Sequence, residues 1–235
     1  MLDPKFIKLA EKIQNPKLQK KVVDLLENPT FMLDGKIYYG PSFDVSPGGL
    51  AFHHKYEGGY IEHVLGSAMI ALTLCDVVEQ VYQGKVDRDL VIAGILLHDI
   101  FKPATYELNE KGDFASSPLA DYLDHISIVT SELVRRDFPK ELVHIVAAHY
   151  GAHGVVKPRT VEALIVHLAD NVDSSLNGQV LNAAASLSQR ATGEQLPKLT
   201  SKEAFEIVHA KAAQGWDGVQ KIMQKLKQQR MSQKT

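Results

Sequence analysis

Apolar residues recur every three or four positions along almost the whole chain, which is the spacing of amphipathic helices. Two short helices are predicted near the N-terminus, at about residues 6–13 and 18–26, separated by Asn15-Pro16. Strand-like alternation is confined to about residues 37–39. The pattern therefore predicts an all-α protein, a helical bundle to which the N-terminal part contributes short helices.

Longer helices are predicted for the rest of the chain, at about residues 60–82, 87–99, 119–136, 140–149 and 160–187, with one or two more after Pro197. The helix at 87–99 is apolar on almost every side, so we expect it at the centre of the bundle, with Asp87 as its N-cap. We predict one fold with three regions: N-terminal helices and a long loop (1–57), a central helical domain (58–190) and a C-terminal helical extension (191–235).

Two segments have unusual composition. Residues 28–59 contain three prolines and six glycines, which predicts a long loop, and a long loop inside a compact domain is often functional. Residues 220–235 contain Lys and Arg but no acid. We interpret this C-terminal stretch as a solvated helix that frays.

The charge balance excludes some classes of protein. With 26 Lys plus Arg against 28 Asp plus Glu, the formal charge of −2 argues against a duplex DNA-binding protein. The apolar stretch at residues 64–75, which has no charged residue or His, is too short to cross a membrane, so no membrane contact is expected. Cys75 is the single cysteine, so no internal disulfide forms, and we expect a buried thiol in a cytoplasmic protein.

The most informative dipeptide is His98-Asp99, which follows an apolar helix and precedes Pro103. Adjacent helical residues point about 100° apart, so both side chains reach one centre only near a helix end. Pro103 provides that end, because its ring blocks continuation of the helix. The pair is therefore a candidate for metal binding.

Two further residues can complete such a site. His63 follows Gly58-Gly59, where the backbone can approach a ligand closely. Asp170 lies in a segment whose apolar pattern predicts a buried helix, so its carboxylate is expected to be paired or metal-bound. The apolar positions in question are Leu164, Ile165, Leu168 and Val172. Two imidazoles and two carboxylates suit divalent Mn, Fe, Ni, Zn or Mg.

The order His63, His98-Asp99, Asp170 resembles the HD-domain superfamily of metal-dependent phosphohydrolases, over residues 58–177. The resemblance implies an HD-domain helical bundle with one or two divalent ions. His125 and His149 are similar to the extra ligands with which some HD proteins bind a second metal. In that arrangement Asp99 bridges two ions, and His63, His98 and Asp170 complete one site while His125 and His149 complete the other.

Three segments are similar to motifs in the HD domains of bacterial 3′-5′ exoribonucleases: residues 59–63, 93–99 and 157–163. Three features depart from that group. Tyr150 replaces a second consecutive histidine, for which His153 is a possible substitute, and Phe101 stands where glycine is frequent. Residues 1–57 are too short and too helical for an OB-type RNA-binding domain, which argues against processive RNA degradation.

Roles can be assigned from the chemistry of such sites. Two ions clamp the attacking and leaving oxygens of a phosphoryl displacement and acidify a water nucleophile, so Asp99 is catalytic without attacking the substrate. Lys102 is expected to hold a substrate phosphate and stabilise charge in the transition state. Lys157 and Arg159 are candidates for a second phosphate at the rim. We expect His53, His54 and Lys55 to be surface loop residues, and His144, His167 and His209 to be structural.

The sequence thus predicts a metal-dependent phosphohydrolase. Its expected substrate is a phosphodiester or phosphomonoester of a nucleotide or a short single-stranded nucleic acid, hydrolysed by a metal-activated water. Two alternatives use the same residues: an HD-type di-iron oxygenase, and a nucleotide-binding protein without catalysis.

Overall fold

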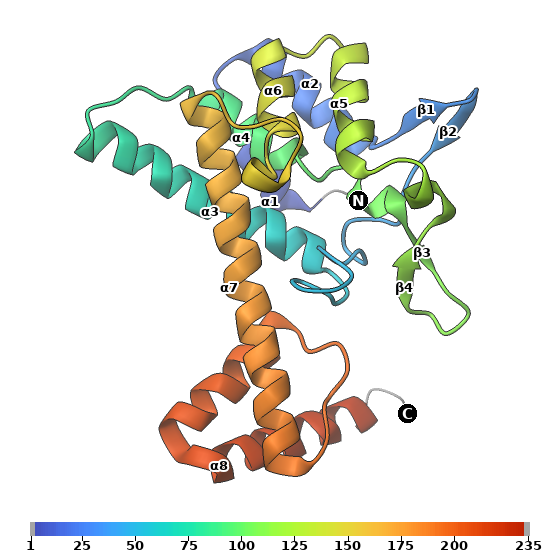
Figure 1. Cartoon of the computed structure of the whole chain (residues 1–235), viewed down its shortest axis with the longest axis vertical. Helices are drawn as coiled ribbons and strands as arrows, with labels where there is room; N and C mark the ends of the chain where they lie inside the picture. Colours follow the sequence, from blue (N-terminus) through green and yellow to red (C-terminus); the bar gives the residue numbers. More distant parts are fainter. Residues whose placement is uncertain (1–2, 233–235) are drawn as a thin grey trace.

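A computed structural model describes residues 3–232 and confirms the all-α prediction (Figure 1). Its helices are α1 (Pro4–Ala10), α2 (Pro16–Glu27), α3 (Gly59–Asp76), α4 (Arg88–Leu97), α5 (His125–Arg135), α6 (Lys140–Ala147), α7 (Val161–Thr192) and α8 (Ser201–Ser232). A π-helical turn, Val77–Val81, extends α3. Two small antiparallel hairpins complete the described fold: β1 (Phe31–Leu33) with β2 (Lys36–Tyr38), and β3 (Tyr106–Leu108) with β4 (Phe114–Ser116).

Side-chain caps fix several helix starts. The Asp87 carboxylate accepts a hydrogen bond from the Leu90 backbone N–H, as predicted for the N-cap of α4. Asp124 caps α5 through the N–H of Ser127 (2.7 Å). The predicted start of this helix at about 119 is therefore too early, because residues 118–121 form a separate 3₁₀ turn.

The main core surrounds α4, which packs against α1, α2, α3, α6 and α7. Val91, Ala93, Ile95, Leu96 and Leu97 are fully buried, so the prediction of a central helix is confirmed. Gly94 allows the close approach of α6, since a Cβ atom there would lie 2.6 Å from the Ile145 side chain. This packing places the C-terminal end of α4 in the middle of the molecule.

The long helix α7 continues beyond the main core and forms a second, smaller core with α8 (Figure 1). Val219, Met223 and Leu226 of α8 are buried there, and α8 bends at Gly215 (φ 67°). Lys225 and Lys227 form ion pairs with Glu206 and Glu194. The prediction of a fraying, solvated C-terminal helix is therefore wrong for residues 220–232, while residues 233–235 lie outside the described residues.

The N-terminal half of α7 presents an unexpected face. Leu164, Leu168 and Val172 are 47, 40 and 48% exposed, and of the four apolar positions predicted to be buried only Ile165 is. The helix instead packs against α3 and α4 through a neighbouring face that contains Ala163, Val166, Ala169 and Asp173. Apolar spacing identified the helix correctly but assigned the wrong side to the core.

The continuous helical segment Gly59–Val81 is long and apolar enough to cross a membrane by length and composition, with a mean hydropathy of 1.6. In the structure one side of this segment packs against α4 and α7, where His63 is completely buried, and about a third of its apolar stretch is buried. Cys75, near its end, is also fully buried, as predicted, and burial raises the pKa of its thiol to about 11.

Candidate metal centre

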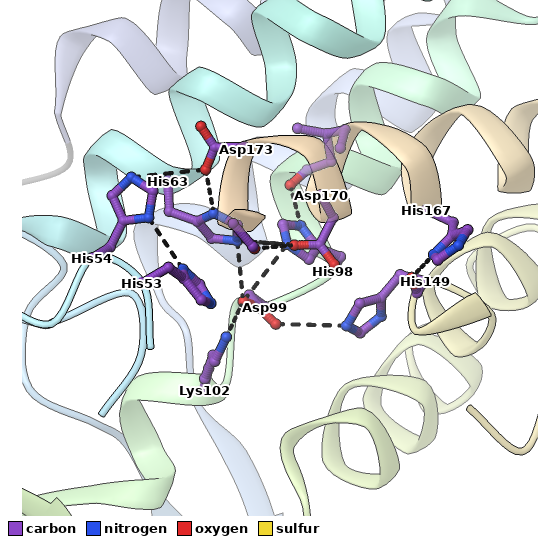
Figure 2. A network of polar contacts seen from close by, with 12 residues as sticks. His53, His54, His63, His98, Asp99, Lys102, His149, His167, Asp170 and Asp173 are labelled. Carbon is purple, nitrogen blue, oxygen red and sulfur yellow. Dashed lines mark hydrogen bonds and ion pairs between the residues drawn. The ribbon is translucent and has the colours of Figure 1, made fainter. Parts of the chain in front are cut away.

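Five helices, α3 to α7, bring the predicted ligands together. His63 lies in the first turns of α3, His98 and Asp99 directly follow α4, and His125 begins α5. His149 follows α6, and Asp170 faces them from α7 (Figure 2). The chain turns sharply after α4, where the Lys102 N–H donates to the carbonyl oxygen of Asp99 (2.8 Å). This helix end allows both side chains of the His98-Asp99 pair to reach the centre, as the sequence predicted.

Besides a cluster of His53, His54 and His63, the donor atoms of the predicted ligands form two groups, His63–His98–Asp170 and Asp99–His125–His149, and within each group they lie within 4.8 Å of one another. Asp99 lies between the groups. Its Oδ2 atom is 3.6 Å from Nε2 of both His63 and His98, and its Oδ1 atom is 3.0 Å from Nε2 of His125 and 3.7 Å from Nε2 of His149. One carboxylate therefore faces both groups, which is the arrangement that a bridging ligand requires.

Hydrogen bonds fix which nitrogen of each imidazole faces the centre. His98 Nδ1 donates to the Ile95 carbonyl (2.8 Å), and His149 Nδ1 donates to the Val146 carbonyl (2.7 Å). His63 Nδ1 donates to Asp173 Oδ2 (2.7 Å). In the uncharged rings of His98 and His149 the proton lies on Nδ1, so each Nε2 lone pair points into the centre. Burial opposes the charge of His63, but Asp170, Asp173 and Asp99 raise its pKa well above the ordinary value, so a cation would have to displace the proton on its Nε2.

The centre contains buried polar atoms that the protein does not satisfy. Asp99 Oδ1 and His149 Nε2 are among the few buried side-chain atoms of residues 3–232 without a hydrogen-bond partner. Such atoms are costly to bury unless a ligand completes them. A divalent cation is a suitable partner for imidazole nitrogen and carboxylate oxygen together, so the donor set fits a metal ion.

Burial and neighbouring charges set the protonation states. Burial lowers the pKa of His98, and it lowers that of His149 to about 4, so both rings are uncharged near neutral pH. Burial opposes ionisation of Asp99, but Lys102 and the nearby imidazoles hold its pKa well below the usual range. The carboxylate is therefore ionised and available to a cation.

Lys102 lies against the centre as predicted, with Nζ 2.7 Å from Asp99 Oδ2. Burial opposes its charge, but Asp99 raises the pKa of the ammonium group above its ordinary value. Lys157 and Arg159 are not brought to the centre. Lys157 Nζ donates to the carbonyl oxygens of Ala152 (2.6 Å) and Gly154 (2.7 Å) in its own loop, and Arg159 is exposed.

Tyr150 and His153 differ in position. His153 is exposed in the turn Gly151–His153 and lies in neither donor group, so it does not replace the second histidine. Tyr150 instead packs beside the second group, with its ring centroid 4.6 Å from that of His149 and its hydroxyl 3.5 Å from His125 Nε2. His167 holds the backbone here, because its Nδ1 donates to the His149 carbonyl (2.7 Å).

The prediction that His53 and His54 are surface residues is wrong. His54 is only 3% exposed, and the His53 ring centroid lies 4.8 Å from that of His63 (Figure 2). The glycines allow this approach, because a Cβ on Gly59 would lie 2.2 Å from the His54 carbonyl oxygen and one on Gly48 would lie 2.7 Å from His54 Cβ. The sequence signal that could have placed His53 and His54 at the centre was a pair of histidines in a glycine-rich loop just before His63.

Comparison with known proteins agrees with this geometry. Residues 60–175 match the HD domain family. A dihydroneopterin 2′,3′-cyclic phosphate phosphodiesterase of Methanocaldococcus jannaschii is 45% identical over 173 residues, which are 74% of this chain and 69% of that protein. No solved structure shows a significant match.

Further curated relatives include 3′-5′ exoribonucleases named YhaM. That of Bacillus pumilus is 29% identical over 176 residues, or 70% of this chain and 51% of the relative. That of Bacillus subtilis is 32% identical over 136 residues, or 53% of this chain and 41% of the relative. The chain thus spans about half the length of these exoribonucleases or less. The family match, the relatives and the donor set agree: the chain belongs to the HD-domain family of metal-dependent phosphohydrolases.

Proposed function

We propose that this protein is a phosphodiesterase that opens the cyclic phosphate of a small, nucleotide-derived ester to give a phosphomonoester. The observation that carries the proposal is the position of Asp99, whose two oxygens face separate groups of histidine and aspartate donors. The similarity to a 2′,3′-cyclic phosphate phosphodiesterase supports the choice of ester.

Six residues would hold the metal: His63, His98 and Asp170 on one side, His125 and His149 on the other, and Asp99 between them. Divalent ions bound there polarise a phosphoryl oxygen and acidify a water molecule, and Mn, Fe, Ni, Zn and Mg all suit this chemistry. The protein contributes a fixed tautomer at three of the imidazoles and an ionised carboxylate. Lys102, which stays an ammonium ion, binds a phosphate oxygen and stabilises negative charge as the ester bond breaks.

The distribution of positive charge favours a small substrate over a polymer. Within residues 3–232, the basic side chain that contacts the donor groups is that of Lys102. Lys157, the nearest candidate from the sequence, is hydrogen-bonded to its own loop. Polynucleotides are usually bound along a basic groove with stacking aromatic rings, whereas a single cyclic phosphate needs one cation beside the metal. We place the reaction in the cytoplasm, in agreement with the buried thiol of Cys75.

The test is a comparison of substrates with the purified protein loaded separately with each metal. We expect a nucleoside 2′,3′-cyclic phosphate to be opened to a monoester, and a short single-stranded RNA to remain intact. The variant His98→Ala should be inactive with an unchanged circular dichroism spectrum. The matched control His209→Ala, at an exposed position of α8, should keep full activity.

Other outcomes would refute the proposal. Shortening of the RNA from its 3′ end without opening of the cyclic phosphate would identify an exoribonuclease. Oxygen consumption by an iron-loaded form without hydrolysis would identify an oxygenase. Tight nucleotide binding without turnover in any metal would identify a binding protein.

A further inference from the structure

The loop 47–58 is built to hold two histidines against the metal centre. The Gly48 N–H donates to the His54 carbonyl (2.9 Å), and the His54 N–H donates to Asn177 Oδ1 on α7 (2.6 Å). Phe52 packs where α7 has no side chain, since a Cβ on Gly178 would lie 2.4 Å from the Phe52 ring. His54 has a φ of 45°, a backbone conformation that non-glycine residues seldom adopt and that is frequent at functional sites.

The same loop is anchored to α8. Tyr56 is buried in the second core, its hydroxyl donates to Glu62 Oε2 (2.8 Å), and it also contacts the Ser201 hydroxyl. Asn177 Nδ2 donates to Ser201 Oγ (2.7 Å). The histidine loop is therefore held from three helices, which is more support than a mobile surface loop has.

A chain of polar contacts fixes the proton positions on these two histidines. His54 Nε2 lies 3.7 Å from Asp173 Oδ2, so the carboxylate favours a proton on this nitrogen. In the uncharged ring His54 Nδ1 is then an acceptor, and it lies 3.1 Å from His53 Nδ1. His53 Nδ1 must supply the proton of that hydrogen bond, which leaves a lone pair on His53 Nε2.

This lone pair has no partner within the described part of the chain. His53 makes its side-chain hydrogen bond through Nδ1, and the ring is partly exposed. Figure 2 shows the His53 ring beside Lys102 and Asp99 at the metal centre. An acceptor nitrogen repels a phosphate oxygen but binds a hydroxyl group, so the chemistry at Nε2 selects for an alcohol.

We propose that His53 is a specificity-determining residue whose Nε2 accepts a hydrogen bond from a free hydroxyl group of the substrate, while Lys102 contacts its phosphate. This inference rests on the proposed function and extends it. It describes the substrate as a cyclic phosphate ester of a polyol or sugar that retains a free hydroxyl. His54 is a positioning residue, since it acts on the substrate only through His53, whereas Asp173 contacts both His54 and the metal-site residue His63.

The test uses a pair of substrates that differ by one hydroxyl: cytidine 2′,3′-cyclic phosphate and its 5′-deoxy analogue. The metal-loaded wild-type protein should prefer the hydroxyl-bearing ester by about 10-fold in kcat/KM, the effect of one hydrogen bond. His53→Leu should remove the preference, with the loss mainly in KM and with an unchanged metal content. His53→Gln offers a carbonyl oxygen as acceptor and should restore part of the preference, and His209→Leu is the matched control.

Four results would overturn the inference while leaving the proposed function intact. The first is a wild-type protein that hydrolyses both esters equally. The other three concern His53→Leu: equal loss of activity on both esters, retention of the full preference, or loss of a metal ion, which would make His53 a metal ligand. A wild-type protein that hydrolyses neither ester would instead refute the proposed function, and the inference with it.

Discussion

The two halves of α7 belong to different parts of the molecule (Figure 1). The N-terminal half packs against α3 and α4 and presents Asp170 and Asp173 to a cluster of buried histidines. The C-terminal half packs against α8 mainly through apolar side chains, which include Leu181 and Ala184 of the second core. One continuous helix therefore joins a region that needs a ligand to a region that does not.

The difference has an energetic meaning. Buried polar atoms without partners oppose folding, so the metal centre, which contains Asp99 Oδ1 and His149 Nε2, is incomplete without a cation. The second core is stabilised by removing apolar side chains from water, which requires no ligand. Metal binding and the stability of the two regions should therefore separate in experiments.

The largest effect is expected from Asp99→Asn. This change removes the charge that faces both donor groups, so we expect loss of bound metal and a fall in kcat of about 1,000-fold or more. The second core does not contact Asp99, so α8 should keep its protection. Metal analysis, kinetics and amide hydrogen exchange provide the measurements.

The matched control for this change is Asp121→Asn, at an exposed carboxylate outside the donor groups. It should keep both metal and activity. Retention of two ions and normal turnover by Asp99→Asn would contradict a bridging role. Loss of protection throughout α8 would show that the two regions are not separate.

The converse experiment is Met223→Ala in the second core, where Met223 is fully buried. Loss of this side chain should lower the free energy of unfolding by about 2–5 kcal/mol, the usual cost of such a cavity. Because no metal-ligating residue lies in the second core, metal content should be unchanged. Urea unfolding and metal analysis test both statements, with exposed Met231→Ala as control.

Sequence patterns predicted the helices and their order because a repeat of three to four residues and well-placed prolines are local signals. They also indicated His63, His98 and Asp99 as candidates, because polar residues at glycine pairs and helix ends are visible without a structure. The β3–β4 hairpin was missed because three-residue strands are too short to show alternation.

Contacts between distant segments could not be predicted in this way. The position of His54 depends on Asn177, which lies 123 residues away in the chain. The face of α7 that is buried depends on the packing of α3 and α4, and aliphatic residues occur on both of its sides. In α8 the spacing of Val219, Met223 and Leu226 was a valid helical signal, but the surrounding lysines led to the wrong interpretation.

A smaller effect is expected from Asp173→Asn, which tests how the metal ligand His63 is oriented. The Asp173 carboxylate accepts the Nδ1 proton of His63, so its loss should lower metal affinity or activity by about 10- to 100-fold. Metal titration followed by kinetics at saturating metal separates the two effects. An unchanged affinity and kcat would show that His63 is oriented without Asp173. The control is Asp217→Asn on α8, outside the donor groups.

The smallest effect concerns Glu132, a buried carboxylate whose partners are supplied by the chain rather than by a metal. It accepts hydrogen bonds from Arg135 (2.6 Å) and Arg136 (3.0 Å). Burial favours its neutral form, but the two guanidinium groups hold its pKa below the ordinary value of 4.5. The stabilisation that the Glu132 ion pairs provide is therefore present above pH 4.5, and it is lost as the pH falls through the lower pKa of the folded state.

Replacement by glutamine should consequently matter only where Glu132 is ionised. At about pH 7 we expect Glu132→Gln to lower the free energy of unfolding by about 1–2 kcal/mol, and this difference should shrink at an acidic pH below the folded-state pKa of Glu132. Urea unfolding at both pH values measures it, and Glu141→Gln, an exposed neighbour on α6, is the control. A constant difference at both values would mean that packing, rather than the ion pairs, makes Glu132 necessary. A difference that depends on added metal would mean that this carboxylate belongs energetically to the centre.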